Sequence, residues 1–133
     1  SQRAALAGAV IVSTPQDLAL IDARKGLNMF RKVNVPLLGI IENMSHFLCT
    51  EVGARHEIFG NGGARAEAAK LGVPCLGEVP LEMAIRATSD EGTPIVASQP
   101  DSPHAAHYRA IAAAVLQTLE RNAPKASPKI IVE

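Results

Sequence analysis

Three short, almost continuously apolar runs punctuate the chain. They are residues 8–13 (GAVIVS), 35–41 (VPLLGII) and 75–79 (CLGEV), and turn-forming residues lie next to them. Runs of this length and composition are typical of strands that are buried on both faces of a sheet. We therefore expect three strands at these positions.

Amphipathic segments between and after these runs predict helices. Leu20, Ala23, Leu27 and Phe30 recur every three or four residues, which predicts a helix over residues 15–32 with Thr14 as its N-cap. Further helices are expected over residues 64–71, closed by Gly72, over residues 81–88, and over residues 103–121. The last of these follows a cap at Ser102, and its apolar face is formed by Tyr108, Ile111, Val115 and Leu119. The remaining segments are expected to be irregular: a polar loop over residues 42–63 and an extended piece over residues 93–97.

This alternation of strands and helices predicts an α/β fold with about three parallel strands, flanking helices and right-handed crossovers. A parallel sheet of three strands has two open edges, which are an aggregation hazard if left bare. We therefore expect other chains, or the rest of a larger protein, to cover them.

Composition and charge exclude several classes of partner. The 133 residues include 13 basic and 13 acidic side chains, so no net field attracts nucleic acid or an anionic membrane. Aromatic residues make up only 3%, which disfavours stacking of single-stranded bases. No apolar run approaches the ~20 residues of a membrane span. Two cysteines do not make a disulfide framework, so a cytoplasmic location is expected.

The carboxyl ends of parallel strands are where ligands bind in open α/β sheets. Residues 13–17, 42–45 and 79–82 follow the three predicted strands. Asn43 offers both an amide donor and a carbonyl acceptor, which match the edge of an adenine base. The alternative is that Asn43 only turns the chain.

A phosphate-binding loop of the form G-x-x-x-x-G-K-[ST] is absent from the sequence. Residues 60–63 (GNGG) are the nearest glycine-rich stretch, but Ala64 and Arg65 follow them. This stretch forms either an anion nest at a helix start or a flexible turn. The chain alone is therefore not expected to hydrolyse ATP, and no residue is assigned a catalytic role.

Four motifs, STPQD, ARKGLNMF, ENMS and GEVPL, occur in this order within residues 8–115. In this combination the chain closely resembles the C-terminal half of the Mrp/ApbC family. Members are P-loop ATPases related to MinD and to the nitrogenase iron protein, and they act as iron–sulfur cluster carriers or scaffolds. The resemblance covers nearly the whole chain.

The resemblance implies a doubly wound P-loop NTPase fold, ATP with Mg as cofactor, a homodimer, and apo iron–sulfur proteins as recipients. It implies that Asn43 recognises adenine and that Val79, Pro80, Leu81 and Glu82 line the base pocket. Residues 1–121 would be the C-terminal half of the nucleotide-binding domain and residues 122–133 a tail. The chain is then a fragment or, alternatively, a natural short paralogue.

The loop after ENMS usually carries Cys-Pro-x-Cys in this family. Here Cys49 holds the first position, whereas Thr50 replaces the proline and Val52 the second cysteine. Two subunits would supply two thiolates, and a four-iron cluster needs about four. We therefore expect cluster binding at Cys49 to be lost or weakened. An alternative is a zinc or iron site that uses His46, Cys49 and His56.

Two functions follow from these observations. The first is the C-terminal portion of an ATP-binding iron–sulfur carrier, with the base-binding residues present and the phosphate loop absent. The second is a non-catalytic dimerisation or interaction module that has lost ATP hydrolysis and cluster binding.

Overall fold

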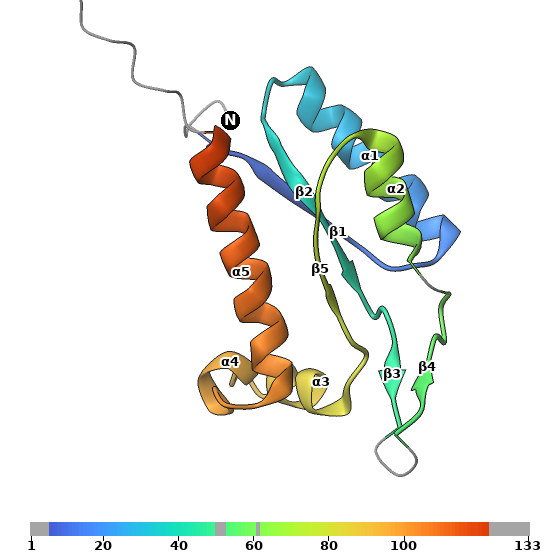
Figure 1. The fold of residues 1–133 in the computed structure, drawn as a ribbon, viewed down its shortest axis with the longest axis vertical. Coiled ribbons are helices and arrows are strands. Elements are labelled where there is room, and N and C mark those ends of the chain that lie inside the picture. Colours follow the sequence, from blue (N-terminus) through green and yellow to red (C-terminus); the bar gives the residue numbers. More distant parts are fainter. Residues whose placement is uncertain (1–5, 50–52, 61, 123–133) are drawn as a thin grey trace, which may run out of the picture.

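The computed structural model describes residues 6–49, 53–60 and 62–122 (Figure 1). In chain order the elements are β1 (Ala9–Ser13), α1 (Asp17–Lys32), β2 (Leu37–Asn43), β3 (Phe47–Leu48), β4 (Arg55–His56), α2 (Gly63–Leu71), β5 (Cys75–Val79), α3 (Met83–Asp90), α4 (Ile95–Ser98) and α5 (Pro103–Asn122). Strands β1, β2 and β5 form a parallel sheet in that order, and β3 pairs with β4 as a separate antiparallel hairpin. The predicted α/β class with three parallel strands is confirmed.

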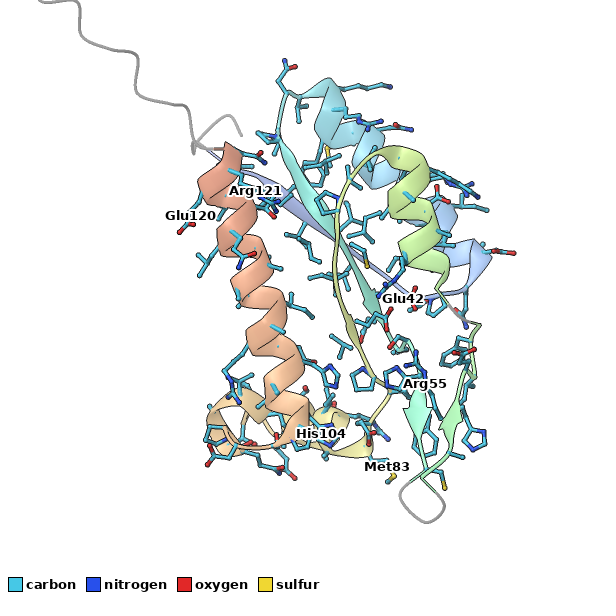
Figure 2. The ribbon with its side chains drawn as sticks, viewed as in Figure 1. Glu42, Arg55, Met83, His104, Glu120 and Arg121 are labelled. Atoms are coloured by element: carbon cyan, nitrogen blue, oxygen red, sulfur yellow. The ribbon has the colours of Figure 1, made fainter. Side chains whose placement is uncertain are left out.

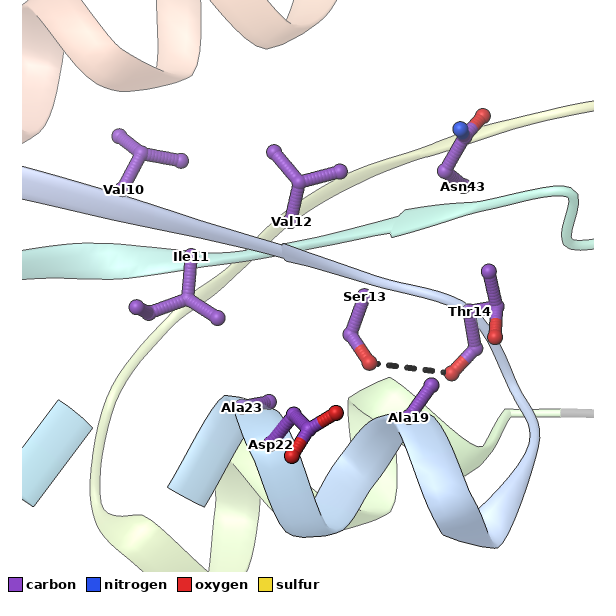
Figure 3. A pocket seen from close by; sticks show the side chains of 9 residues that line it. All are labelled: Val10, Ile11, Val12, Ser13, Thr14, Ala19, Asp22, Ala23 and Asn43. Atoms are coloured by element: carbon purple, nitrogen blue, oxygen red, sulfur yellow. Dashed lines mark hydrogen bonds between the residues drawn. The ribbon is translucent and has the colours of Figure 1, made fainter. Parts of the chain in front are cut away.

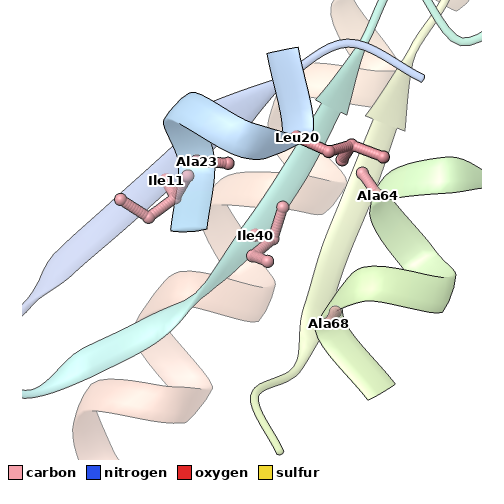
Figure 4. Packing of buried hydrophobic residues seen from close by; sticks show 6 residues of the cluster. All are labelled: Ile11, Leu20, Ala23, Ile40, Ala64 and Ala68. Carbon is pink, nitrogen blue, oxygen red and sulfur yellow. The ribbon is translucent and has the colours of Figure 1, made fainter. Parts of the chain in front are cut away.

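Helices cover both faces of the sheet. Helices α1 and α2 pack against one face, and α5 packs against β5 and β2 on the other (Figure 1). The core between the sheet and α1 and α2 is a cluster of small and branched side chains (Figure 4): Ile11, Leu20, Ala23, Ile40, Ala64 and Ala68. Three of its four helix residues are alanines, and the α2 pair, Ala64 and Ala68, are 0% and 1% exposed.

Helix α1 buries the predicted stripe, since Leu20, Ala23 and Leu27 are all buried. The predicted N-cap was wrong. Gln16 is the N-cap, its ψ of 138° is extended, and among the described residues no side chain caps the helix. The helix begins at Asp17, two residues later than predicted, and the hydroxyl of Thr14 lies 3.4 Å from Oε1 of Gln16.

A close approach of two backbones fixes the middle of the sheet. The N–H of Ile40 donates to the carbonyl of Pro74 at 2.9 Å, just before β5 begins. The neighbouring Gly39 has φ of 152°, and a Cβ there would lie 2.5 Å from the same carbonyl oxygen. Glycine is therefore required at this position of β2.

Two segments differ from the sequence prediction. Residues 95–98 form the short helix α4, not an extended piece, because the N–H groups of Ala97 and Ser98 both donate to the carbonyl of Pro94. The predicted polar loop contains the hairpin of β3 and β4, whose strands of two residues are too short to show a periodicity.

Helix α5 begins and ends close to the predicted bounds. The N–H of Ala105 donates to Oγ of Ser102 at 3.1 Å, which confirms the predicted cap before Pro103. Ile111, on the predicted apolar face of α5, is buried. The predicted tail lies, from residue 123 on, outside the described residues. Across the described part of the chain, the helices are too short or too polar to cross a membrane.

Candidate functional site

Asn43, the last residue of β2, lies where two cavities meet at the carboxyl ends of the strands. One cavity, of about 450 Å³, follows the free edge of β1 (Figure 3) and is lined by Val10, Ile11, Val12, Ser13, Thr14, Ala19, Asp22, Ala23 and Asn43. The other, of about 160 Å³, lies under α5 and is lined by Val12, Ile41, Asn43, Val79, Tyr108 and Ile111. Asn43 and Val12 line both cavities.

The side chain of Asn43 also turns the chain. Its Oδ1 accepts a hydrogen bond from the N–H of Met44 at 3.0 Å, and Met44 has a φ of 55°. The carbonyl oxygen keeps a second lone pair. Within the described residues, the Nδ2 group makes no hydrogen bond to protein, so donors and an acceptor remain for a ligand.

The predicted residues 79–82 do not all face one cavity. Val79 lines the cavity of about 160 Å³ together with Asn43, and Pro80 is buried. Leu81 and Glu82 line a different cavity, of about 290 Å³, beside the β3–β4 hairpin. The structure thus brings Asn43 and Val79 together but places Leu81 and Glu82 elsewhere.

Two lining residues of the smaller cavity come from α5 and were not assigned to a site from the sequence. Tyr108 and Ile111 belong to the apolar face of α5, and its periodicity signalled only that they face the sheet. Burial raises the pKa of the Tyr108 hydroxyl above its usual value of 10.0, so this ring stays neutral at physiological pH.

A buried carboxylate caps α2. Oε2 of Glu42 accepts the N–H of Ala64 at 2.8 Å, and Glu42 is only 1% exposed (Figure 2). Gly62, the N-cap, has a φ of 64° and offers no side chain. Gly62 and Gly63 therefore start a helix whose positive end already holds the Glu42 carboxylate, and a phosphate there would have to displace Glu42.

Backbone hydrogen bonds fasten the start of the hairpin to the end of β5. The N–H of Ser45 donates to the carbonyl of Val79 at 3.0 Å, and the N–H of Leu81 donates to the carbonyl of His46 at 2.7 Å. Oγ of Ser45 lies 2.8 Å from Nδ1 of His46. Burial, and then the charge of Arg55, lower the pKa of His46 below 6.5.

Ion pairs connect β4, the second strand of the hairpin, to β5. Glu78 of β5 accepts a hydrogen bond from Arg65 of α2 at 2.8 Å and lies 3.8 Å from Arg55 of β4. Both arms of the hairpin are thus tied to the last residues of β5, next to the cavity that Asn43 lines.

Cys49 lies near the tip of this hairpin. Its N–H donates to the carbonyl of Ala54 at 2.9 Å, and its thiol is free and half-buried. Thr50 and Val52, which replace family residues, lie outside the described residues. Among the described residues, no three Cys, His, Asp or Glu side chains are gathered as a metal site, so the structure lends no support to the alternative zinc or iron site at His46, Cys49 and His56.

A family model decides the relationship of the chain to known proteins. The model described as ParA, NUBPL iron-transfer P-loop NTPase, matches residues 1–116. The chain belongs to this family. The resemblance to iron–sulfur carriers of the Mrp/ApbC type is thereby confirmed.

Relatives with a named role in iron–sulfur transfer match most of the chain. The iron–sulfur cluster transfer protein NUBPL of Dictyostelium discoideum is 49% identical over 136 aligned residues, covering 98% of the chain and 42% of the relative. The iron–sulfur cluster carrier protein of Escherichia coli K12 is 50% identical over 112 residues, covering 84% of the chain and 30% of the relative. The chain therefore spans less than half the length of these relatives.

Solved structures agree on the fold. A nucleotide-binding protein from Archaeoglobus fulgidus, solved in complex with ADP, matches with a TM-score of 0.57 and 38% identity, over 65% of the chain and 35% of that protein. The cell-division ATPase MinD of Pyrococcus furiosus matches with a TM-score of 0.63 and 24% identity, over 83% of the chain and 42% of that protein. The predicted kinship with MinD-like P-loop NTPases is confirmed at the level of the fold.

Proposed function

We propose that this chain is the base-binding part of an ATP-dependent iron–sulfur cluster carrier. The observation that carries the proposal is the position of Asn43, with free donors and a free lone pair, at the junction of two cavities at the carboxyl ends of β1, β2 and β5. Family membership supplies the chemistry: a purine nucleotide and an iron–sulfur cargo.

The adenine base enters the cavity of about 160 Å³ in this proposal. Val12, Ile41, Val79 and Ile111 provide apolar contacts for the faces of the ring, and Asn43 reads its edge. Tyr108 closes the cavity from α5. The side chains of Leu81 and Glu82 line another cavity. In this proposal they therefore contribute to the base site only through their backbone, which continues from Val79.

In this proposal, the sugar and phosphates of the nucleotide extend from the base through the cavity of about 450 Å³ toward the free edge of β1. In the described part of the chain, β1 pairs with β2 alone, and Val12, near the carboxyl end of β1, is 61% exposed. Leu18, on the adjoining first turn of α1, is 77% exposed. A bare apolar edge of this kind suits a further strand. We assign that strand, the phosphate loop and the Mg site to the portion of the relatives that the chain does not cover.

The cluster is the cargo, carried near Cys49 in a homodimer and passed to apo iron–sulfur proteins. One thiol per chain is a weak anchor, because four thiolates normally hold a four-iron cluster. Other ligands must complete the coordination, or the cluster is bound only transiently. The cytoplasm remains the predicted location.

Isothermal titration with ATP tests the base site. The chain is joined to the N-terminal part of the Dictyostelium relative that it does not cover, and Asn43→Ala is compared with Asn122→Ala, a matched change at the exposed end of α5. Loss of a buried hydrogen bond to the base is expected to weaken ATP about 5- to 100-fold for Asn43→Ala. The control should bind as the parent does; absence of ATP binding in the joined parent would refute the proposal.

Anaerobic reconstitution with iron and sulfide separates the carrier from the non-catalytic module. A cluster absorption that is stoichiometric, and that Cys49→Ser removes, supports the carrier. No cluster absorption in the joined parent, despite ATP binding, would leave the interaction module as the better description.

A further inference from the structure

A groove runs along the exposed side of α3. Its first part is the cavity of about 290 Å³ between α3 and the β3–β4 hairpin, and its second part is a cavity of about 320 Å³ farther along the helix. Met83 and Arg86 line both parts, so the two cavities adjoin, and the residues that line the second part all belong to α3 and its C-cap. Figure 2 shows Met83 beside the hairpin, at the beginning of α3.

The hairpin end of the groove is apolar. Four apolar residues line it, together with Glu82 and Arg86: Phe47, Ile58, Leu81 and Met83. Met83 is 83% exposed and Ile58 is 55% exposed, so this cluster leaves apolar surface in water. Exposed apolar clusters with a polar rim mark interaction sites in soluble proteins.

The far end of the groove is acidic. Its two acidic residues lie at the C-terminal end of α3, where the helix dipole is also negative. Asp90 ends α3, Glu91 is its C-cap, and the last turn contains no basic residue. The C-terminus of a helix carries partial negative charge and favours cations. Arg86 pairs with Asp90 at 3.3 Å, but within the described residues Glu91 has no ion pair. The partial negative charge at the C-terminus of α3 therefore repels the carboxylates of Asp90 and Glu91. A cation from a binding partner would weaken this repulsion.

We propose that this groove, beyond the nucleotide and cluster sites, docks a segment of a partner protein that carries an apolar anchor followed by basic residues. The apolar side chain enters between Phe47 and Met83, and the basic residues lie against Asp90 and Glu91. The apolar end of the groove thus receives the anchor and the acidic end receives the basic residues.

The length of α3 sets the spacing of the motif. The eight residues of α3 extend about 12 Å at ~1.5 Å per residue. An extended peptide covers that distance with about four residues at ~3.3 Å each. The anchor and the first basic residue should therefore stand about four positions apart.

The docked anchor would lie on the same side of the hairpin as Cys49. Phe47 pairs with His56, and Cys49 bonds to Ala54 two residues farther along each strand. Alternate residues of a strand share a face, so Phe47 and Cys49 point the same way. The docking itself does not depend on cluster or nucleotide binding.

Fluorescence anisotropy with a labelled peptide, Gly-Phe-Ser-Gly-Ser-Lys-Lys-Gly, tests the proposal on the full chain. Met83→Ser should weaken binding about fivefold or more, because the anchor loses apolar contact. The double change Asp90→Asn with Glu91→Gln should weaken it about threefold at low salt and remove most of its salt dependence. Peptides with glycine for phenylalanine, or with glutamates for the lysines, should bind more weakly.

Matched controls lie on other surfaces. Leu116→Ser removes a 60% exposed apolar side chain from α5, and Asp101→Asn removes an exposed acid; both should bind the peptide as the parent does. No saturable binding of the Phe–Lys peptide up to about 1 mM would overturn the proposal. So would equal affinities of Met83→Ser and the parent. Sedimentation that shows a dimer which Met83→Ser dissociates, without peptide binding, would assign the groove to a second copy and likewise overturn it.

Discussion

The buried carboxylate of Glu42 provides the sharpest test of how the site is held together. Glu42 belongs to β2, and its side chain reaches the start of α2. Its hydrogen-bond donor, the N–H of Ala64, belongs to a residue that is 0% exposed and 22 positions away in sequence. Replacing Glu42 by leucine leaves the N–H of Ala64 buried without an acceptor. The expected loss in the free energy of unfolding is about 1–3 kcal/mol.

Glutamine at the same position separates the hydrogen bond from the charge. Glu42→Gln keeps a carbonyl oxygen for Ala64 and removes only the negative charge at the positive end of α2. That charge contributes about 0.3–1 kcal/mol. Glu42→Leu should therefore be less stable than Glu42→Gln by about 1 kcal/mol or more.

Urea unfolding of the full chain, followed by circular dichroism, measures both variants. Thermal unfolding should agree, at about 3–6 °C per kcal/mol for a chain of this size. Amide hydrogen exchange at Ala64 should accelerate in Glu42→Leu and much less in Glu42→Gln. Glu120→Leu, at an exposed position of α5, is the control and should stay within about 0.5 kcal/mol of the parent. Equal stabilities of the Leu and Gln variants at Glu42 would refute the capping argument.

Three further predictions test the fold and its electrostatics. Gly39→Ala should cost about 2 kcal/mol or more in urea unfolding, because its Cβ would meet the carbonyl oxygen of Pro74 at 2.5 Å; an unchanged midpoint would contradict this close approach. The hydrogen bond from Arg24 holds the pKa of Glu67 below its usual 4.5, so this stabilisation is complete above pH 4.5 and is lost as the pH falls through the lower folded value. Glu67→Gln should flatten the acid limb of the stability profile, and an unchanged limb would exclude this contribution. By NMR titration, the pKa of His46 should lie below 6.5, because partial burial and the charge of Arg55 disfavour the imidazolium; a midpoint at or above 6.5 would argue against the hydrogen-bonded, half-buried ring.

Local patterns in the sequence predicted much of the fold. The apolar runs at 8–13 and 75–79 match β1 and β5 to within one residue, whereas β2 begins and ends two residues later than the run at 35–41, because a run of apolar residues is a local signal whose ends the sequence marks poorly. The cap at Ser102 and the stop at Gly72 were equally local. Helix α4 was missed because a single turn that starts at Pro94 has no periodicity to read.

Some residues of the candidate site were likewise predicted from the sequence, and others were placed only by the structure. Asn43 was singled out because it follows a strand, and it lies at the carboxyl edge of the sheet as expected. Leu81 and Glu82 were grouped with it by their place in a motif, but their side chains line the groove beside α3. Tyr108 was missed, since nothing in the sequence of α5 tells which helical turn reaches the strand ends.

The sequence by itself determined the order and type of the main elements, the family, and the absence of a phosphate loop from these residues. Only the tertiary structure decided that Glu42 caps α2, that Asn43 and Val79 share a cavity with Tyr108, and that α3 and the hairpin form a groove. The reason is physical. Strand and helix formation depend on neighbours a few positions away, whereas these contacts join residues that only the crossover connections and the packing of helices on the sheet bring together.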